Sequence, residues 1–171
     1  HRSNLQIMHV FRDTLVLVGI FFLAMLLEAF HGPRDWPFWL GWFRPHFTVM
    51  VVLLWATYYS GSINFFLIWC LGLLLDVLYG SPLGTNACLL VLISFLAWKF
   101  YERFVSYSYF QQVVLVFLAC FAYRVIFCSI TQENLVNILM DALISSSVSS
   151  VFWPFFQTLV RKLISARELK T

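Results

Sequence analysis

Residues Gly72 to Asn86 read GLLLDVLYGSPLGTN, an apolar run that stops in a compact turn and then starts again. Gly80 and Gly84 bracket a Ser-Pro-Leu segment that contains Pro82, a pattern typical of a helix end followed by a tight turn. Thr85 or Asn86 can then cap the next helix with its side chain. The stretch therefore predicts two helices that are joined by a rigid turn.

The first of these helices carries a carboxylate, Asp76, close to its end. Gly72 precedes Asp76 by about one helical turn, so the two residues share a face, and a glycine there permits close approach of another backbone. A charge at the end of so apolar a run needs a partner that compensates it. We expect a carboxylate that lies beneath the turn.

The composition of the whole chain makes that charge unusual. Of the 171 residues, 61% are hydrophobic and 11% are charged, whereas soluble domains carry about 25% charged residues. The mean hydropathy is +0.84. An integral membrane protein is therefore expected, and a net charge of +3 is too small to indicate nucleic-acid binding. The four cysteines lie in apolar runs without metal-ligand spacing and are interpreted as packing residues.

Six apolar runs are long enough, or nearly so, to cross a bilayer as helices. They are Thr14 to Phe30, Phe47 to Tyr59, Ile63 to Leu78, Thr85 to Phe100, Val113 to Ile130 and Leu135 to Leu163. Because the runs are apolar at nearly every position, a β-barrel with alternating polar residues is disfavoured. The predicted fold is all-α: one transmembrane domain over residues 1–171, built as a compact bundle of six helices.

The distribution of basic residues predicts the orientation of this bundle. With six spans, eight lysines and arginines fall on the side of the two termini and two, Arg34 and Arg44, on the other. The more basic side of a membrane protein faces the cytoplasm. Both termini are therefore expected in the cytoplasm, with the turn after Asp76 facing outward. The outer loop HGPRDWPFWLGWFRPH is rich in tryptophan and is expected to lie along the membrane interface.

Charged residues inside the predicted spans fall at similar depths. Helical rise places Glu28, Asp76 and Arg124 about 16 to 21 Å from the inner ends of their helices, and Asp141 enters the same level from outside. An intramembrane ion is costly unless it is paired or reaches water. We expect Asp76 to pair with Arg124, with Glu28 or Asp141 sharing the contact. The alternative is that each side chain extends outward to the headgroups, which we prefer for Glu28.

The last run combines small residues with a proline. Ser145 and Ser149 lie one turn apart, a spacing that favours close helix packing, although hydroxyls could also line a substrate path. Pro154 lacks a backbone donor and predicts a kink.

Four pieces of the sequence resemble the family of MreD, the rod shape-determining membrane protein of bacteria. They are FRPHF with Arg44 and Pro45, GLLLDVLYGSPLG, the FQQ that opens the fifth run, and WPFFQTLVRKL at the end of the sixth. The resemblance implies a non-enzymatic scaffold of the inner membrane, without a cofactor, that works in cell elongation and peptidoglycan synthesis. The implied partners are MreC, the glycosyltransferase RodA with its transpeptidase, the actin-like MreB and membrane lipids.

The same resemblance implies a fold similar to the substrate-binding subunits of energy-coupling-factor vitamin transporters. Those subunits often carry two alanines four residues apart in their first span, whereas Ala24 and Ala29 are five apart here. This departure counts against vitamin uptake, although a small-molecule carrier remains the alternative to a scaffold. The residues themselves provide no Ser-His-Asp set, metal cluster or phosphate-binding loop, so an enzyme is not expected.

Overall fold

The computed structural model describes residues 2–29, 46–59, 61, 63–131 and 135–168. These residues form seven α-helices and no strands, which confirms the all-helical prediction. The helices are α1 (Arg2–Ala29), α2 (Phe47–Tyr58), α3 (Phe65–Tyr79), α4 (Thr85–Lys99), α5 (Tyr101–Ser106), α6 (Tyr109–Thr131) and α7 (Leu135–Glu168). The sequence did not predict α5, a short helix that follows α4 after a break at Phe100.

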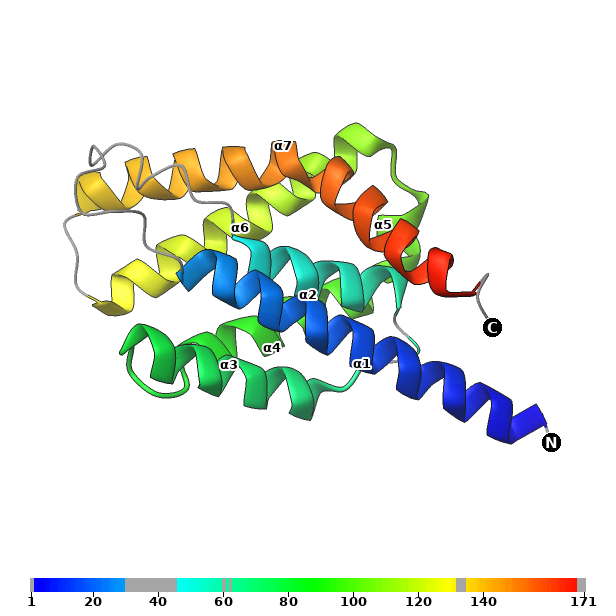
Figure 1. Ribbon diagram of the computed structural model, residues 1–171. Helices are drawn as coiled ribbons and strands as arrows, with labels where there is room; N and C mark the ends of the chain where they lie inside the picture. Colours follow the sequence, from blue (N-terminus) through cyan, green and yellow to red (C-terminus); the bar gives the residue numbers. More distant parts are fainter. Residues whose placement is uncertain (1, 30–45, 60, 62, 132–134, 169–171) are drawn as a thin grey trace.

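Helices α1, α3 and α6 run in one direction, and α2, α4 and α7 run back (Figure 1). The start of α1, the end of α7 and α5 lie at one end of the bundle, which we call the terminal end. The turn between α3 and α4 lies at the other end, which we call the turn end. Helix α7 contains Pro154 and bends along its length, as expected where a proline removes a backbone hydrogen bond (Figure 1).

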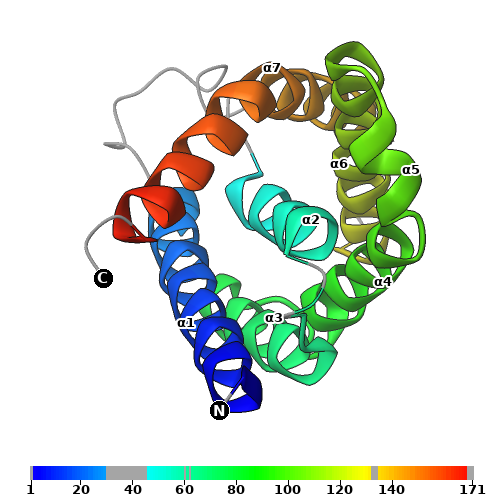
Figure 2. The same cartoon turned by 90° about the vertical axis from the view of Figure 1, so that its right-hand side faces the viewer.

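Helix α2 runs through the centre of the bundle, and the other helices surround it (Figure 2). Every residue from Thr48 to Thr57 is buried. The sequence of α2 is compatible with this position, because a helix that is apolar on all sides can be buried on all sides. The core is built around it by Leu17 and Phe21 of α1, Leu75 of α3 and Trp153 of α7.

The outside of the bundle is also apolar, and many large side chains there are exposed. Residues Tyr109–Ile130 of α6 and Ile138–Lys162 of α7 are long and apolar enough to cross a membrane, and α2, α3 and α4 are shorter apolar helices. An apolar surface of this kind suits contact with lipid.

Helices α3 and α4 form the hairpin that the stretch from Gly72 to Asn86 predicts. Asn64 caps α3 by accepting hydrogen bonds from the amides of Phe66 and Leu67, and α3 ends at Gly80, whose φ is +62°. A Cβ atom at Gly72 would lie 2.4 Å from the Cα of Ala87. The absence of a side chain at Gly72 therefore permits the two helices to pack backbone against backbone.

Candidate functional site

The carboxylate of Asp76 is completely buried and accepts four hydrogen bonds. One comes from the Ser81 hydroxyl (2.7 Å) and one from the Gly84 amide (2.8 Å). The other two come from the backbone amide and the side-chain nitrogen of Asn86, each at 3.0 Å. Helix α4 begins at Thr85, so Gly84 holds its N-cap position, and a glycine has no side chain that could cap the helix. The carboxylate of Asp76, which lies on α3, caps α4 instead.

This arrangement answers the question that Asp76 raises, and it corrects two predictions. The partial positive charge of the α4 N-terminus offsets the unfavourable position of Asp76 at the C-terminal end of α3. Asp76 therefore needs no arginine, and its expected ion pair with Arg124 is wrong: both of its oxygens bind the turn and α4. Neither Thr85 nor Asn86 acts as the predicted side-chain cap, because Gly84 occupies the cap position of α4.

Glu28 occupies the equivalent position between α1 and α2. Its Oε2 atom accepts hydrogen bonds from the Thr48 hydroxyl (2.7 Å) and the Thr48 amide (3.3 Å). Its Oε1 atom lies 3.3 Å from Nδ1 of His46, the residue at the cap position of α2. The expectation that Glu28 extends to the headgroups is therefore wrong, because the first turn of α2 supplies donors inside the bundle.

Arg124 of α6 pairs with Asp141 of α7, one of the two carboxylates that were expected to share its contact. The Arg124 Nε atom lies 2.5 Å from Oδ2 of Asp141. The other oxygen of Asp141 is 3.4 Å from the Ser145 hydroxyl, one turn further along α7. The pair therefore joins two helices that are neighbours in the chain and pack closely together.

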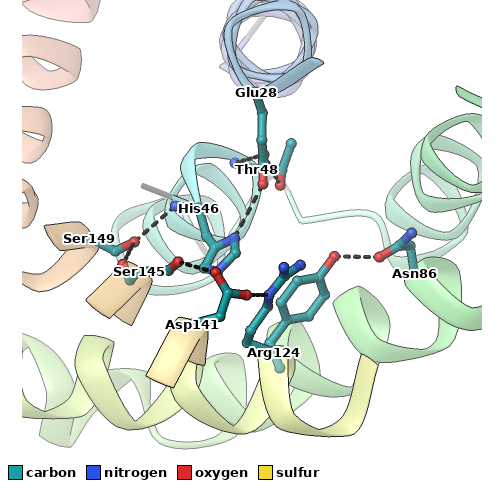
Figure 3. Close-up of polar contacts among 9 residues, drawn as sticks. Glu28, His46, Thr48, Asn86, Arg124, Asp141, Ser145 and Ser149 are labelled. Atoms are coloured by element: carbon teal, nitrogen blue, oxygen red, sulfur yellow. Dashed lines mark hydrogen bonds and ion pairs between the residues drawn. The ribbon is translucent and has the colours of Figure 1, made fainter. Parts of the chain in front are cut away.

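Further contacts connect these pairs, and Figure 3 shows them without Asp76, which it does not draw. The His46 amide donates to the Ser149 hydroxyl (2.8 Å), which in turn donates to the Ser145 carbonyl (2.8 Å). Across the bundle, the Tyr123 hydroxyl donates to the side-chain oxygen of Asn86. The rings of His46 and Tyr123 meet edge to face with centroids 5.7 Å apart.

We call this set the polar layer. Its members lie on α1, α3, α4, α6 and α7 and at the start of α2, and they are Glu28, His46, Thr48, Asp76, Asn86, Tyr123, Arg124, Asp141, Ser145 and Ser149. Each described helix except α5 contributes to it or begins at it. Because buried polar groups are costly when unpaired, the layer holds these helices at fixed relative heights.

The chemistry of the polar layer is that of a structural network. Within the described ranges, no three His, Cys, Asp or Glu side chains come close enough to hold a metal ion. The carboxylates are bound by backbone amides, hydroxyls, a histidine and an arginine, so they are held in place by several donors. A proton on His46 Nδ1 lets the ring donate to Glu28, and the buried Nε2 atom has no hydrogen-bond partner among the residues that the structure describes.

Several of these residues were not singled out from the sequence. His46 and Thr48 lie within three residues after the FRP that precedes the second run, so their positions at a helix start were the available signal. Asn86 was predicted only as a possible cap of the next helix. Arg44 and Pro45, which were singled out, lie outside the described residues. Ser145 and Ser149 of α7 are buried, and their hydroxyls bind groups of the protein, which agrees with packing rather than a substrate path.

A second polar cluster lies where α2 ends. The Tyr58 hydroxyl donates to Gln112 of α6 (3.3 Å), and the Arg161 guanidinium of α7 lies 4.3 Å from the centroid of the Tyr58 ring. Gln112 and Arg161 belong to the FQQ and WPFFQTLVRKL pieces of the sequence. Both ends of the central helix are therefore bound to its neighbours by polar contacts.

The comparisons with known proteins are consistent with one another. A family model described as rod shape-determining protein MreD matches residues 10–163, which include the whole polar layer. The rod shape-determining protein MreD of Haemophilus influenzae is 26% identical over 148 residues, which cover 86% of this chain and 89% of that relative. No solved structure matches the chain.

Proposed function

This chain belongs to the MreD family of rod shape-determining proteins, and from that membership we propose that it is a scaffold of the cell-elongation machinery. It has a role in rod-shape determination, and the family is named for cell shape rather than for a reaction. In the proposed role the chain binds MreC through membrane helices. Through MreC it helps to organise peptidoglycan synthesis by RodA and its transpeptidase, in a larger complex with MreB.

The central position of α2 is the observation that most favours a scaffold over a carrier. A carrier of the vitamin-transporter type needs a site inside the bundle that opens outward, and here residues 48–57 of α2 fill the middle. Among the described residues, one pocket lies between α4 and α6 and another between α3 and α4. A filled interior with an apolar exterior supports a protein that binds other helices in the membrane.

The proposal includes a location and a topology. The chain is a multi-pass protein of the bacterial inner membrane with six spans, a fold similar to energy-coupling-factor substrate-binding subunits, and both termini in the cytoplasm. The positions of Lys99, Arg103 and Arg161 support this orientation, because each lies in a helix segment at the terminal end of the bundle (Figure 1).

Co-purification in mild detergent tests the scaffold. The full chain is expressed with MreC from which the extracellular part has been deleted, and we expect the membrane helix of MreC to be retained. The matched control carries an unrelated apolar helix in place of that membrane helix, and we expect it to be lost. If truncated MreC behaves like this control while a vitamin-sized molecule co-purifies with the chain, the carrier replaces the scaffold.

A further inference from the structure

A groove on the outside of the bundle lies between α4 and α6, two helices that touch each other little although α4 packs closely against α3. Its volume is about 480 Å³, within the range of small-molecule sites. Small side chains leave the space open: Ala97 on one wall, and Ala119 and Ala122 on the other. Leu53 of the central helix forms part of the floor.

The groove has about the length of one membrane leaflet. Along α4 and the residue that follows it, the lining extends from Leu89 to Phe100, and on α6 it extends from Leu115 to Ile126. At 1.5 Å per residue each wall is roughly 16 Å long, close to half of a hydrocarbon core of about 30 Å.

The polarity of the groove differs at its two ends. Most of the lining is aliphatic or aromatic, and its one charged member, Arg103 of α5, lies at the terminal end together with Tyr107. Within the described residues no ion pair is found for Arg103. Glu102, beside it in the chain, lies near the Tyr101 hydroxyl (3.4 Å) instead. An apolar channel that ends at a cation has the chemistry of an anionic lipid, with its acyl chain inside and its headgroup at the arginine.

We propose that the groove between α4 and α6 binds one anionic phospholipid of the inner leaflet, with its headgroup at Arg103. The bound acyl chain fills the gap between α4 and α6 and covers Leu53 of α2. Of the polar layer only Tyr123 also lines this groove, and the site does not depend on the scaffold role. It does use the orientation proposed above, which places Arg103 at the cytoplasmic surface.

Native mass spectrometry of the purified full chain tests the site. The probes are phosphatidylglycerol and phosphatidylcholine of the same chain length, added in equal amounts. We expect one phosphatidylglycerol to be retained in preference to phosphatidylcholine, and Arg103→Gln to reduce that preference roughly fivefold. Lys99→Gln is the matched control, because Lys99 is an exposed cation in the last turn of α4 outside the groove lining, and it should leave the preference unchanged.

A second pair of variants tests the acyl chain. Ala119→Phe fills the groove and should abolish retention of the lipid, whereas Val114→Phe, on an exposed part of α6 outside the lining, should not. Equal preference in Arg103→Gln and Lys99→Gln would overturn the proposal even if Ala119→Phe does not fold. A photoreactive residue at Leu96 that forms an adduct with a protein in cells, and none with lipid, would also overturn it, because a helix would then occupy the groove.

Discussion

At the scale of single residues, two carboxylates are stabilised in the same way. Asp76 and Glu28 each stand near the end of a helix that runs toward the turn end, and each accepts hydrogen bonds from the first turn of the helix that runs back. The first backbone amides of a helix have no hydrogen-bond acceptor within that helix, so a carboxylate placed there can accept their hydrogen bonds. The carboxylate also interacts favourably with the partial positive charge of the helix N-terminus. The charges therefore connect helices and do not require cations.

Arg124 and Asp141 are the exception, and they allow a prediction about coupling. Removal of either charge leaves the other poorly compensated in a largely buried place, so the loss of both should cost less than the sum of the two single losses. We expect Arg124→Gln and Asp141→Asn to show a coupling on the order of 1 kcal/mol in thermal melts in detergent.

The control for this cycle pairs Arg124→Gln with Asp76→Asn. Asp76 binds the turn and α4 instead of the arginine, so these two changes should add. A coupling between Arg124 and Asp76 as large as that between Arg124 and Asp141 would contradict the assignment of the ion pair.

At the scale of helices, the sequence predicts the hairpin of α3 and α4 well but not the partner of Asp76. Gly80, Pro82 and Gly84 mark a turn by local chemistry, which a sequence carries directly. Helical rise also gives the depth of a side chain. It does not give the direction in which that side chain points, and α4 lies between α3 and α6 around the bundle (Figure 2). Asp76 and Arg124 therefore lie at similar depths without forming an ion pair.

The contact between α3 and α4 makes Gly72 sensitive to substitution. In Gly72→Ala the new Cβ would meet the Cα of Ala87 at 2.4 Å and its amide nitrogen at 2.8 Å, both of them backbone atoms that cannot move aside alone. We expect the variant to be destabilised by about 1–3 kcal/mol and to melt at a lower temperature in detergent.

Gly19 of α1 provides the matched control for Gly72. A Cβ at Gly19 would meet nothing within 4 Å, and alanine favours a helix over glycine by about 0.5–1 kcal/mol. Gly19→Ala should therefore melt at the same temperature as the unaltered protein or slightly higher. Equal destabilisation by the two substitutions would show that close packing at Gly72 is not the cause.

At the scale of the whole molecule, the helices other than α5 and their order could be predicted from the sequence, but their arrangement could not. A helix normally reveals its buried face by a stripe of apolar residues, whereas these helices are apolar nearly all round. Both lipid and the protein core accept such surfaces, so the pattern does not distinguish them. Helix α2 lies in the centre because polar contacts bind both of its ends, at Thr48 and at Tyr58.

The two ends of the bundle should face opposite sides of the membrane, and cysteine labelling in whole cells can test this. The basic residues predict that the terminal end is cytoplasmic and that the turn between α3 and α4 is outside. Leu83 is a suitable reporter for the turn, because it is 75% exposed, whereas the Ser81 hydroxyl binds Asp76. Ser106, which is exposed in α5, reports on the terminal end.

Single cysteines at Leu83 and Ser106 are introduced after Cys70, Cys88, Cys120 and Cys128 have been replaced. A membrane-impermeant thiol reagent should label position 83 in intact cells and position 106 only after the membrane is opened. The reason is the eight-to-two excess of lysine and arginine on the side of the termini, since charge on short loops determines which side stays in the cytoplasm. The reverse labelling pattern would show that the bundle has the opposite orientation, with Arg103 at the outer surface. Labelling of both positions in intact cells would mean that α4 does not cross the membrane.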